Sequence, residues 1–353
     1  MNSIEPTYKI IDLRSDTVTL PTTEMRDLMY HTPLGDDVFK EDPTVNLLQE
    51  MAAQRMGKED AIFVPSGTMA NLVSLISHCS PGDEAILGDK AHIFLNEAGG
   101  MSVVGGIHPH TIPNQPDGTI RVEDMKKAIR KTNDHYPRTR IICLENTQNS
   151  CNGAPLPVEY MDSVGEFAKA HDLLIHLDGA RIFNASVALN VDVKELTRHA
   201  DSVAFCLSKG LAAPVGSVIC GSGQFIAQAR RKRKLVGGGM RQVGVLAAAG
   251  IVALEKMVSR LQEDHDNARK FAEGIADMQE FSVDLNTIKT NIIYFSIKAK
   301  VNPETFLFYL GKRGVKILSL SSETFRAVTH FGITGNCIDT ALSVIRDFVR
   351  DCC

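Results

Sequence analysis

Three short segments in the middle of the chain carry side chains suited to holding a ligand, and the first is Ser66, Gly67 and Thr68. These residues follow the apolar run 61–64 and begin a stretch with helical periodicity. A glycine-containing turn that opens a helix exposes backbone N–H groups at the positive end of the helix dipole, where a phosphate can bind. Because Ser and Thr are also the commonest N-caps, simple capping is the alternative. The absence of a GKS/T loop and of a full GxGxxG motif argues against nucleoside triphosphates and dinucleotides.

The second and third segments place ionisable groups directly after apolar runs. Asp178 and Arg181 follow the run 173–177, and Lys209 follows the run 202–207 and precedes Gly210. In an open α/β sheet, ligands bind at the carboxyl ends of strands. A capping Asp with a surface Arg is the ordinary alternative for the first pair. Lys209 is either a solvated loop charge or a desolvated amine that can form a Schiff base.

The three segments together indicate one cofactor. A phosphate site, a carboxylate that keeps a pyridine nitrogen protonated and an amine that binds an aldehyde are what pyridoxal 5'-phosphate (PLP) requires of a protein. Their order along the chain also suits the large domain of fold-type I enzymes that use PLP. We therefore expect PLP as the cofactor and no metal ion.

The elements that must position these residues alternate along the chain. Short apolar runs at 84–87, 140–144, 173–177, 202–207 and 217–220 are separated by stretches of helical periodicity at 71–78, 122–131, 158–171 and 224–235. This rhythm predicts an α/β fold with a mostly parallel central sheet flanked by helices on both faces. The expected fold is that of the fold-type I PLP-dependent transferase-like proteins.

Beyond residue 240 the pattern changes to that of a smaller α+β domain. We expect one long helix over about 240–278, strands at 292–297 and 324–328, and helices near 303–312 and 337–349. The first 45 residues show no clear element. The expected domains are an N-terminal segment, 1–45, packing over the active site and an interface, a large PLP-binding domain, 46–250, and a small C-terminal domain, 251–353.

Composition excludes several classes of function. The 353 residues include 38 Lys and Arg against 42 Asp and Glu, so the net charge of −4 offers no field for a nucleic acid. The apolar stretch 243–254 is too short to span a membrane, and the N-terminus has no apolar leader. Eight cysteines without CxxC spacing predict reduced, mostly buried thiols in a cytoplasmic protein.

Two further motifs have ordinary explanations. The segment His108-Pro109-His110 has the spacing of a metal-binding pair, but without clustered acidic or cysteine partners we expect it to belong to a strand or loop. The basic run 230–234 lies in a predicted helix, and we expect a solvated face or a subunit contact rather than a nucleic-acid site.

The sequence resembles the low-specificity L-threonine aldolases, a branch of the aspartate-aminotransferase-like superfamily, over essentially its whole length. The matching blocks, in the family's order, are DLRSDTVTLPT, GDDVFKEDPTV, FVPSGTMAN, AHIFLNEAGG, LENTQN, HLDGARIFNA, FCLSKGLAAPVGS, VGGGMRQ and FRAVTHF. The resemblance implies a PLP-dependent carbon–carbon lyase that cleaves L-threonine or L-allo-threonine to glycine and acetaldehyde. A PLP-dependent β-eliminating lyase or racemase acting on a small amino acid is the alternative enzyme, and a non-catalytic cofactor carrier is the alternative outside enzymes.

The resemblance also implies roles for the residues that would hold the cofactor. Lys209 would be the Schiff-base lysine, Asp178 the partner of the pyridine nitrogen and Arg181 a contact on the side of the phenolic oxygen. Residues 66–68 would surround the phosphate. His92, in AHIFLNEAGG, matches the histidine that stacks on the cofactor ring, and as a hypothesis it, or a water that it positions, removes the proton of the β-hydroxyl.

Other matches concern the substrate and the assembly. Arg326 and Ser15 match residues that bind the substrate carboxylate, and Arg241 matches an arginine that reaches the phosphate in a neighbouring subunit. A homo-oligomer with a dimer as its minimal unit, and a tetramer as the expected assembly, follows from the resemblance. Gln148 stands where many members have His, and Phe39 where a Tyr is common; we expect Gln148 to contact the substrate.

Overall fold

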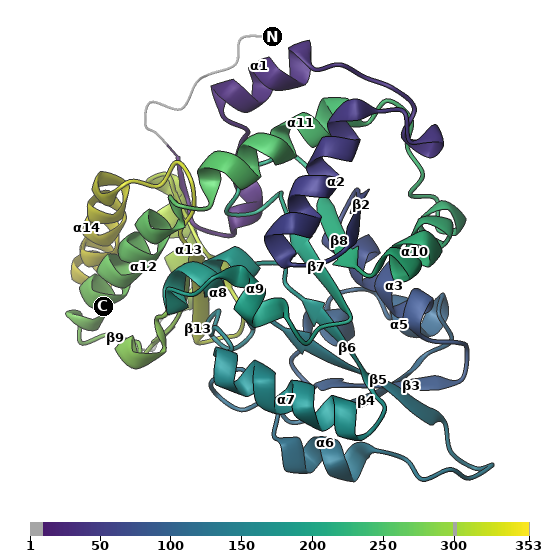
Figure 1. Ribbon diagram of the computed structural model, residues 1–353. Coiled ribbons are helices and arrows are strands. Elements are labelled where there is room, and N and C mark those ends of the chain that lie inside the picture. The colour runs from purple at the N-terminus through teal and green to yellow at the C-terminus, as the bar shows by residue number, and fades with distance from the viewer. Residues whose placement is uncertain (1–9, 299–301, 353) are drawn as a thin grey trace.

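A seven-stranded sheet forms the centre of the molecule in the computed structural model, which describes residues 10–298 and 302–352 (Figure 1). The strand order is β2-β8-β7-β6-β5-β3-β4. Only β8 runs antiparallel to its neighbours in this sheet, which confirms the predicted mostly parallel arrangement. The strands are β2 (Asp60–Val64), β3 (Asp83–Gly88), β4 (His108–Ile112), β5 (Arg138–Glu145), β6 (Leu174–Asp178), β7 (Ser202–Cys206) and β8 (Ser217–Gly221).

Helices cover both faces of this sheet. On one face α3 (Gly67–His78) packs against α10 (Gly223–Leu235). The other face carries α2 (Pro43–Met56), α7 (Val158–Ala170), α8 (Ile182–Leu189) and α9 (Val193–Thr197). The expected helices at 71–78, 158–171 and 224–235 are confirmed, and the helix expected at 122–131 is α6, which ends at Ala128.

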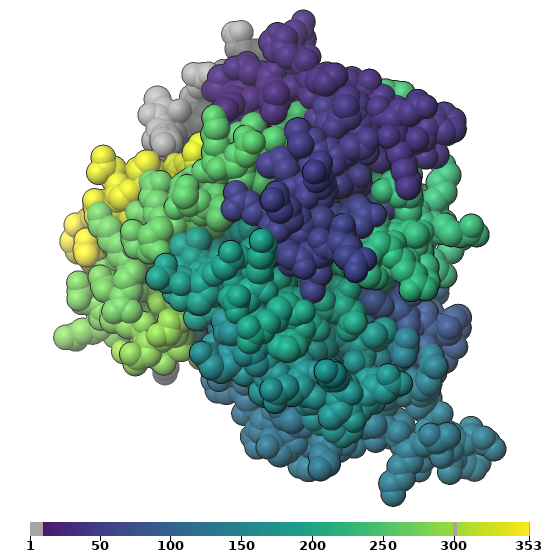
Figure 2. Space-filling view, in the orientation of Figure 1, coloured from purple at the N-terminus to yellow at the C-terminus, as the bar shows by residue number. Residues whose placement is uncertain are grey.

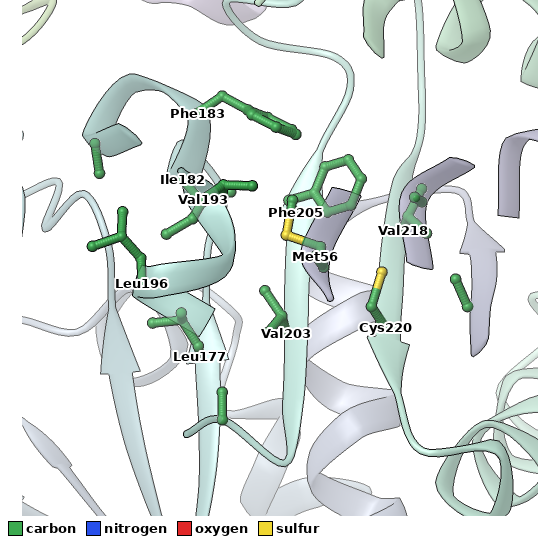
Figure 3. Close-up of a cluster of buried hydrophobic side chains, with 14 of the residues drawn as sticks. Met56, Leu177, Ile182, Phe183, Val193, Leu196, Val203, Phe205, Val218 and Cys220 are labelled. Carbon is green, nitrogen blue, oxygen red and sulfur yellow. The ribbon is translucent and has the colours of Figure 1, made fainter. Parts of the chain in front are cut away.

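Alternating side chains of the strands reach the two faces, as a sheet with period two requires. Val203 and Phe205 of β7 lie in the cluster drawn in Figure 3 with Met56 and with Phe183 and Leu196 of the covering helices. The intervening Ala204 belongs instead to the cluster beneath α3 and α10. Both faces of the strands are therefore buried, which explains why the runs read as continuously apolar.

The single long helix expected over 240–278 is wrong. Helix α11 (Gly244–Val252) passes into a π-helical turn, Ala253–Met257, and α12 (Leu261–Ala276) begins only after a further turn. The wide turn keeps Leu254, Met257 and Leu261 in the same hydrophobic cluster. No Pro or Gly marks the interruption, because it arises from tertiary packing rather than from a helix-breaking residue.

A second sheet and its helices follow, as expected for an α+β tail. Its strand order is β12-β13-β10-β9, all antiparallel. The strands are β9 (Phe281–Ser282), β10 (Ile292–Ile297), β12 (Leu318–Ser319) and β13 (Thr324–Val328), with helices α13 (Pro303–Lys312) and α14 (Gly335–Cys352). Phenylalanines in tilted and edge-to-face contact fill its separate core, among them Phe295, Phe306 and Phe325. The division into domains at residues 45 and 250 stays a prediction.

The N-terminal segment contains more structure than the sequence indicated. Strand β1 (Ile11–Asp12) pairs with β11 (Val315–Lys316), and α1 (Thr23–His31) lies against α11. The expectation of no clear element before residue 45 is therefore wrong. Helix α1 was not predicted because its apolar periodicity is weak. Met25 is its one buried side chain. Figure 2 shows these residues in purple over one end of the molecule, and the loop between α6 and β5 projecting from the other.

The motifs with ordinary explanations also have defined places. His108 and His110 lie on β4, and each Nδ1 is 3.1 Å from an oxygen of the buried Glu84. Within the basic run on α10, Arg233 is buried and donates to Asp37, so the expectation of a wholly solvated or subunit-facing run is wrong for this residue.

The cysteines agree with the prediction of reduced, mostly buried thiols in the part of the chain that the structure describes. Cys352 is exposed, and Cys353 lies outside the described residues. The buried cysteines are Cys79, Cys143, Cys151, Cys206, Cys220 and Cys337. Among the described helices, none is long and apolar enough to cross a membrane.

Candidate functional site

A cavity of about 540 Å³ gathers five of the residues predicted from the sequence. They are Ser15, His92, Arg181, Lys209 and Arg326, which come from five separate parts of the chain. The remaining lining residues are Thr17, Leu95, Asn96, Asn149, Ser150, Tyr294 and Leu320. The cavity lies where β6 and β7 end, the position at which α/β sheets bind ligands.

Asp178 is the last residue of β6 and is 3% exposed. It does not line the cavity, but its carboxylate lies within 4.8 Å of a ring nitrogen of His92, which does. Its Oδ1 accepts a hydrogen bond from the backbone N–H of Ala180 at 3.0 Å, and its Oδ2 accepts one from Nδ2 of Asn71 at 2.8 Å. Glu145, the last residue of β5, is its register partner on the neighbouring strand. These two donors hold the carboxylate of Asp178 in a fixed orientation.

His92 begins the short helix α4 (His92–Leu95) and is anchored by two carboxylates. Its Nδ1 lies 2.8 Å from Oε1 of Glu97, and its backbone N–H donates to Oε2 of Glu145 at 2.8 Å. The hydrogen bond to Glu97 raises the pKa of His92; burial opposes this, and the nearby Asp178 adds to it. A histidine whose pKa is raised above its usual value of about 6.5 exchanges protons near neutral pH.

Ligand atoms of His92, Glu97 and Asp178 lie within 4.8 Å of one another, a spacing that would also suit a metal ion. However, the two carboxylates already share one amide group, because Nδ2 of Asn71 donates to both Glu97 and Asp178 at 2.8 Å. This shared donor accounts for their proximity without an ion.

The amine of Lys209 makes no hydrogen bond or ion pair with any described residue. The lysine is half-buried beyond the end of β7, and its backbone carbonyl accepts a hydrogen bond from Oγ1 of Thr19 at 3.0 Å. An unpaired primary amine at the wall of a cavity is free to react with a carbonyl group. The Schiff-base role of Lys209 has this geometry as its support and stays a prediction.

Two arginines lie side by side at the cavity but differ in their charge partners. Arg181 donates from Nε and Nη2 to the two oxygens of the buried Asp16, each at 2.7 Å. Arg326 has no carboxylate partner among the described residues; Nη2 donates to Oδ1 of Asn149 at 3.0 Å, and its buried Nε has no acceptor. Burial, followed by the charge of Arg181, lowers the pKa of Arg326. Such an unsatisfied guanidinium is suited to binding a carboxylate in a bidentate manner.

The predicted phosphate loop begins α3 outside the lining of this cavity. Oγ of Ser66 accepts a hydrogen bond from the backbone N–H of Met69 at 3.1 Å, so the serine does cap the helix. The N–H groups of Gly67 and Thr68 make no hydrogen bond with described residues. A Cβ on Gly67 would lie 2.9 Å from Sγ of Cys206, so a larger residue does not fit there.

Arg241 and Gln148 also lie outside the lining. The side chain of Arg241 is 56% exposed, and its Nη1 lies 2.9 Å from Oδ2 of Asp36 in the same chain. Gln148 is 1% exposed and donates to the carbonyl of Lys90 at 2.9 Å and to Glu145 at 3.3 Å. The expected contacts of Gln148 with substrate and of Arg241 with a neighbouring subunit stay predictions. Phe39 is exposed, at 68%.

Sequence reasoning missed several residues that define the site. All of them except Tyr294 lie inside one of the sequence blocks that carry the resemblance, so a polar residue within such a block was the available signal. The missed residues are Asp16, Asn71, Glu97, Glu145, Asn149 and Tyr294.

The residues present fit PLP on the chemistry of their donors and acceptors. PLP presents three groups: an aldehyde, a pyridine nitrogen and a phosphate. The unpaired amine of Lys209 can bind the aldehyde, and the carboxylate of Asp178 at the end of β6 can accept from the pyridine nitrogen. The N–H groups at the start of α3 can donate to the phosphate. The unsatisfied Nε of Arg326 corresponds to the carboxylate of an amino acid.

Comparisons with known proteins agree with this chemistry. Residues 12–298 match the family described as beta-eliminating lyase. A probable low-specificity L-threonine aldolase 2 of Arabidopsis thaliana is 49% identical over 342 residues, covering 96% of each chain. The low specificity L-threonine aldolase of Escherichia coli K12 is 47% identical over 325 residues, covering 92% of this chain and 95% of its own.

Solved structures show the same fold at lower identity. The threonine aldolase of Leishmania major superposes with a TM-score of 0.81 at 17% identity, covering 95% of this chain and 98% of its own. The serine palmitoyltransferase of Sphingomonas wittichii gives a TM-score of 0.77 at 16% identity, covering 97% and 87%. By its matched family and by these relatives, the chain belongs to the beta-eliminating lyase family, in the group of the low-specificity L-threonine aldolases.

Proposed function

We propose that this protein is a PLP-dependent aldehyde-lyase that cleaves L-threonine, L-allo-threonine and other β-hydroxy-α-amino acids to glycine and an aldehyde. One observation carries the proposal. A single cavity is lined by the unpaired amine of Lys209, the unsatisfied guanidinium of Arg326 and His92, and the buried Asp178 lies within 4.8 Å of His92. The 49% identity to a probable low-specificity L-threonine aldolase supports the choice of substrate.

Each residue then has a role that its contacts allow. PLP, when bound, stabilises the electron pair left on the substrate's α-carbon. Lys209 supplies the amine that holds the cofactor, and Asp178 holds a proton at the ring nitrogen. Arg326, with Ser15, orients the substrate carboxylate, so that the bond to the β-carbon is the one that breaks. His92, or a water that it positions, takes the proton of the β-hydroxyl.

The test is an assay of purified protein loaded with PLP. L-threonine and L-allo-threonine should each give glycine and acetaldehyde in equal amounts, and phenylserine should give benzaldehyde. Lys209→Ala should abolish both turnover and the visible absorbance of the bound cofactor while the thermal unfolding transition remains. Release of pyruvate and ammonia from serine without acetaldehyde from threonine would instead identify a β-eliminating lyase.

We also infer a homo-oligomer with a dimer as its smallest competent unit and a tetramer as its assembly, in which Arg241 acts on the partner's cofactor. Two features support this inference. Arg241 is half-exposed and absent from the cavity of its own chain. Large apolar side chains are also exposed, such as Leu20, Tyr30 and Leu235 at 68%, 84% and 74%, and their burial against a partner would remove apolar area from water.

Hybrid dimers test this arrangement. Lys209→Ala chains and Arg241→Ala chains should each be inactive alone. When they are mixed and allowed to exchange, the site that uses the intact Lys209 of one chain and the intact Arg241 of the other should recover activity. No recovery despite verified exchange would contradict sharing in trans. We further propose that the protein acts in the cytoplasm and forms glycine there. Its buried thiols are compatible with the reducing conditions of that compartment.

A further inference from the structure

A continuous chain of hydrogen bonds leads away from Asp178 through the buried interior. Oδ2 of Asp178 lies 2.8 Å from Nδ2 of Asn71, and Oδ1 of Asn71 lies 3.0 Å from Nε2 of His176. Nδ1 of His176 lies 2.8 Å from Oγ of Ser202, which in turn lies 2.8 Å from Nε2 of His78. Asn71, His176 and Ser202 are at most 2% exposed.

The direction of every bond in this chain is determined by chemistry. Asn71 faces carboxylate oxygens of both Asp178 and Glu97, so its NH₂ group must point to them and its carbonyl oxygen must accept from Nε2–H of His176. Burial lowers the pKa of His176 to about 4, so the ring is neutral and its Nδ1 must accept. Ser202 therefore donates to His176.

The far end of the chain is His78. Because the one hydroxyl proton of Ser202 is used toward His176, its oxygen accepts from Nε2–H of His78. Burial lowers the pKa of His78 to about 3, and its ring stacks on Phe225 with centroids 4.3 Å apart. All four bonds thus point toward Asp178, and hydrogen bonds aligned in this way polarise and strengthen one another.

His78 also reaches a second cavity, at the opposite end of the sheet. This cavity has a volume of about 460 Å³ and is lined by Leu174, the first residue of β6, and by Asp201, which precedes β7. The hydrogen-bond chain therefore spans the sheet from the amino ends of these strands to the carboxyl ends.

Two other buried carboxyl groups, those of Glu145 and Glu97, lie close to Asp178 at the near end of the chain. Asp178 has Glu145 as its register partner on β5 and shares Asn71 with Glu97. Burial, followed by the charge of Asp178, raises the pKa of Glu145 to about 7. Burial is also the main reason why the pKa of Glu97 is raised, although its hydrogen bond to His92 opposes the shift. Asp178 therefore lies among other acidic groups, and its hydrogen-bond donors must hold it in place.

We propose that the chain from His78 through Ser202, His176 and Asn71 fixes the orientation of the Asp178 carboxylate. Asn71, His176 and Ser202 are positioning residues, because they act on the cofactor only through Asp178. The inference rests on the proposed function in one respect, namely that Asp178 faces the ring nitrogen of PLP.

Ser202→Ala tests the proposal because it removes one hydroxyl group in the middle of the chain. Ser74→Ala is the matched control, since Ser74 is a fully buried serine of α3 whose hydroxyl has no partner. His78→Phe preserves an aromatic ring against Phe225 but removes the last donor. The measurements are the affinity for PLP, the pH midpoint of the visible absorbance of the bound cofactor, and kcat and KM.

We expect Ser202→Ala to raise the pH midpoint by about half a unit or more. Without the hydroxyl of Ser202, Asp178 should hold the proton on the ring nitrogen of PLP less firmly. Loss of that proton makes the cofactor less positive, so the proton that remains on it is harder to remove. The affinity for PLP should fall, and kcat should decrease by about tenfold. A loss of this size is typical at metal sites when a residue that orients a ligand side chain, rather than the ligand itself, is changed. The KM for threonine should stay within about twofold, because Arg326 is untouched. His78→Phe should shift the midpoint in the same direction by less.

Ser74→Ala should leave the midpoint unchanged, and Ser202→Thr, which restores a hydroxyl, should bring it back. The proposal is overturned if Ser202→Ala and Ser74→Ala have the same midpoint and kcat while the unaltered protein binds PLP and cleaves threonine. An unaltered protein that binds no PLP would overturn the proposed function as well, so the two failures are distinguishable.

Discussion

Arg181 and Arg326 donate hydrogen bonds to the same atom, Oδ1 of Asn149, at 3.3 and 3.0 Å. The shared acceptor brings two guanidinium groups together, yet Asp16 neutralises only Arg181. Arg326 therefore keeps a positive charge with no described carboxylate in direct contact, beside an unpaired Nε. An incoming carboxylate would satisfy both, which makes Arg326 the anchor of the site and Arg181 part of its frame.

Arg326→Lys keeps the positive charge of the anchor but loses its two parallel donors. We expect kcat/KM for threonine to fall by about 10- to 100-fold, which corresponds to about 1.4–2.8 kcal/mol of lost interaction. The visible absorbance of bound PLP should be unchanged, because Lys209 and Asp178 are untouched. Steady-state kinetics together with the absorption spectrum measure both effects. An unaltered kcat/KM would remove Arg326 from the substrate site.

The ion pair of Asp16 and Arg181 should make the free energy of unfolding depend on pH in the acid range. Burial alone would raise the pKa of Asp16, but the charge and hydrogen bonds of Arg181, with Lys209 and Arg326, lower it well below its usual value. Since the folded pKa lies below the unfolded value of about 3.9, the stabilisation is complete above about pH 5 and is lost as the pH falls through the folded pKa.

Asp16→Asn should therefore cost about 3–5 kcal/mol of unfolding free energy at neutral pH, because it leaves the buried Arg181 without a counter-charge. The same variant should lose stability less steeply than the unaltered protein below pH 4. Urea unfolding at a series of pH values measures both quantities. Equal slopes in acid would show that Asp16 is not the group responsible.

How far the sequence predicts this molecule depends on the range of the interactions. Strands of the central sheet were predictable because burial on both faces makes them continuously apolar. Lys209 and Asp178 were predictable because each follows such a strand directly. The hydrogen-bond partners of these groups were not predictable. Asn71, for example, donates to Asp178, which is 107 positions away, and no local sequence pattern indicates such a contact.

The same reasoning explains the errors. Arg233 reads as one more exposed cation in a basic run, but it is buried because Asp37, 196 positions away, accepts its hydrogen bond. The break between α11 and α12 has no Pro or Gly to announce it, because packing alone imposes it.

Glu97→Gln tests whether His92 exchanges the proton. The hydrogen bond to Glu97 is the largest cause of the raised pKa of His92. Glutamine can still accept from the ring but carries no charge, so the pKa of His92 should fall. If neutral His92 is required, the acid limb of the kcat/KM profile should move to lower pH by about one unit. Glu24→Gln, which changes an exposed carboxylate outside the cavity, is the charge-matched control. An acid limb that does not move would assign the proton transfer to another group.

Gln148→His introduces the residue that the resemblance to the low-specificity L-threonine aldolases leads us to expect at this position. In this chain the carboxamide is fully used: it donates to the carbonyl of Lys90 and to Glu145, and it accepts from the backbone N–H of Cys151 at 2.9 Å. A neutral imidazole has one donor and one acceptor, so it cannot replace all three bonds, and we expect a loss of about 1–3 kcal/mol in unfolding free energy. Because the amide does not line the cavity, kcat should change by less than about tenfold, or about 1.4 kcal/mol in barrier height. The preference between threonine and allo-threonine is free to shift. A hundredfold gain in kcat with a new ionisation in the pH–rate profile would show that a titrating group at this position moves the proton.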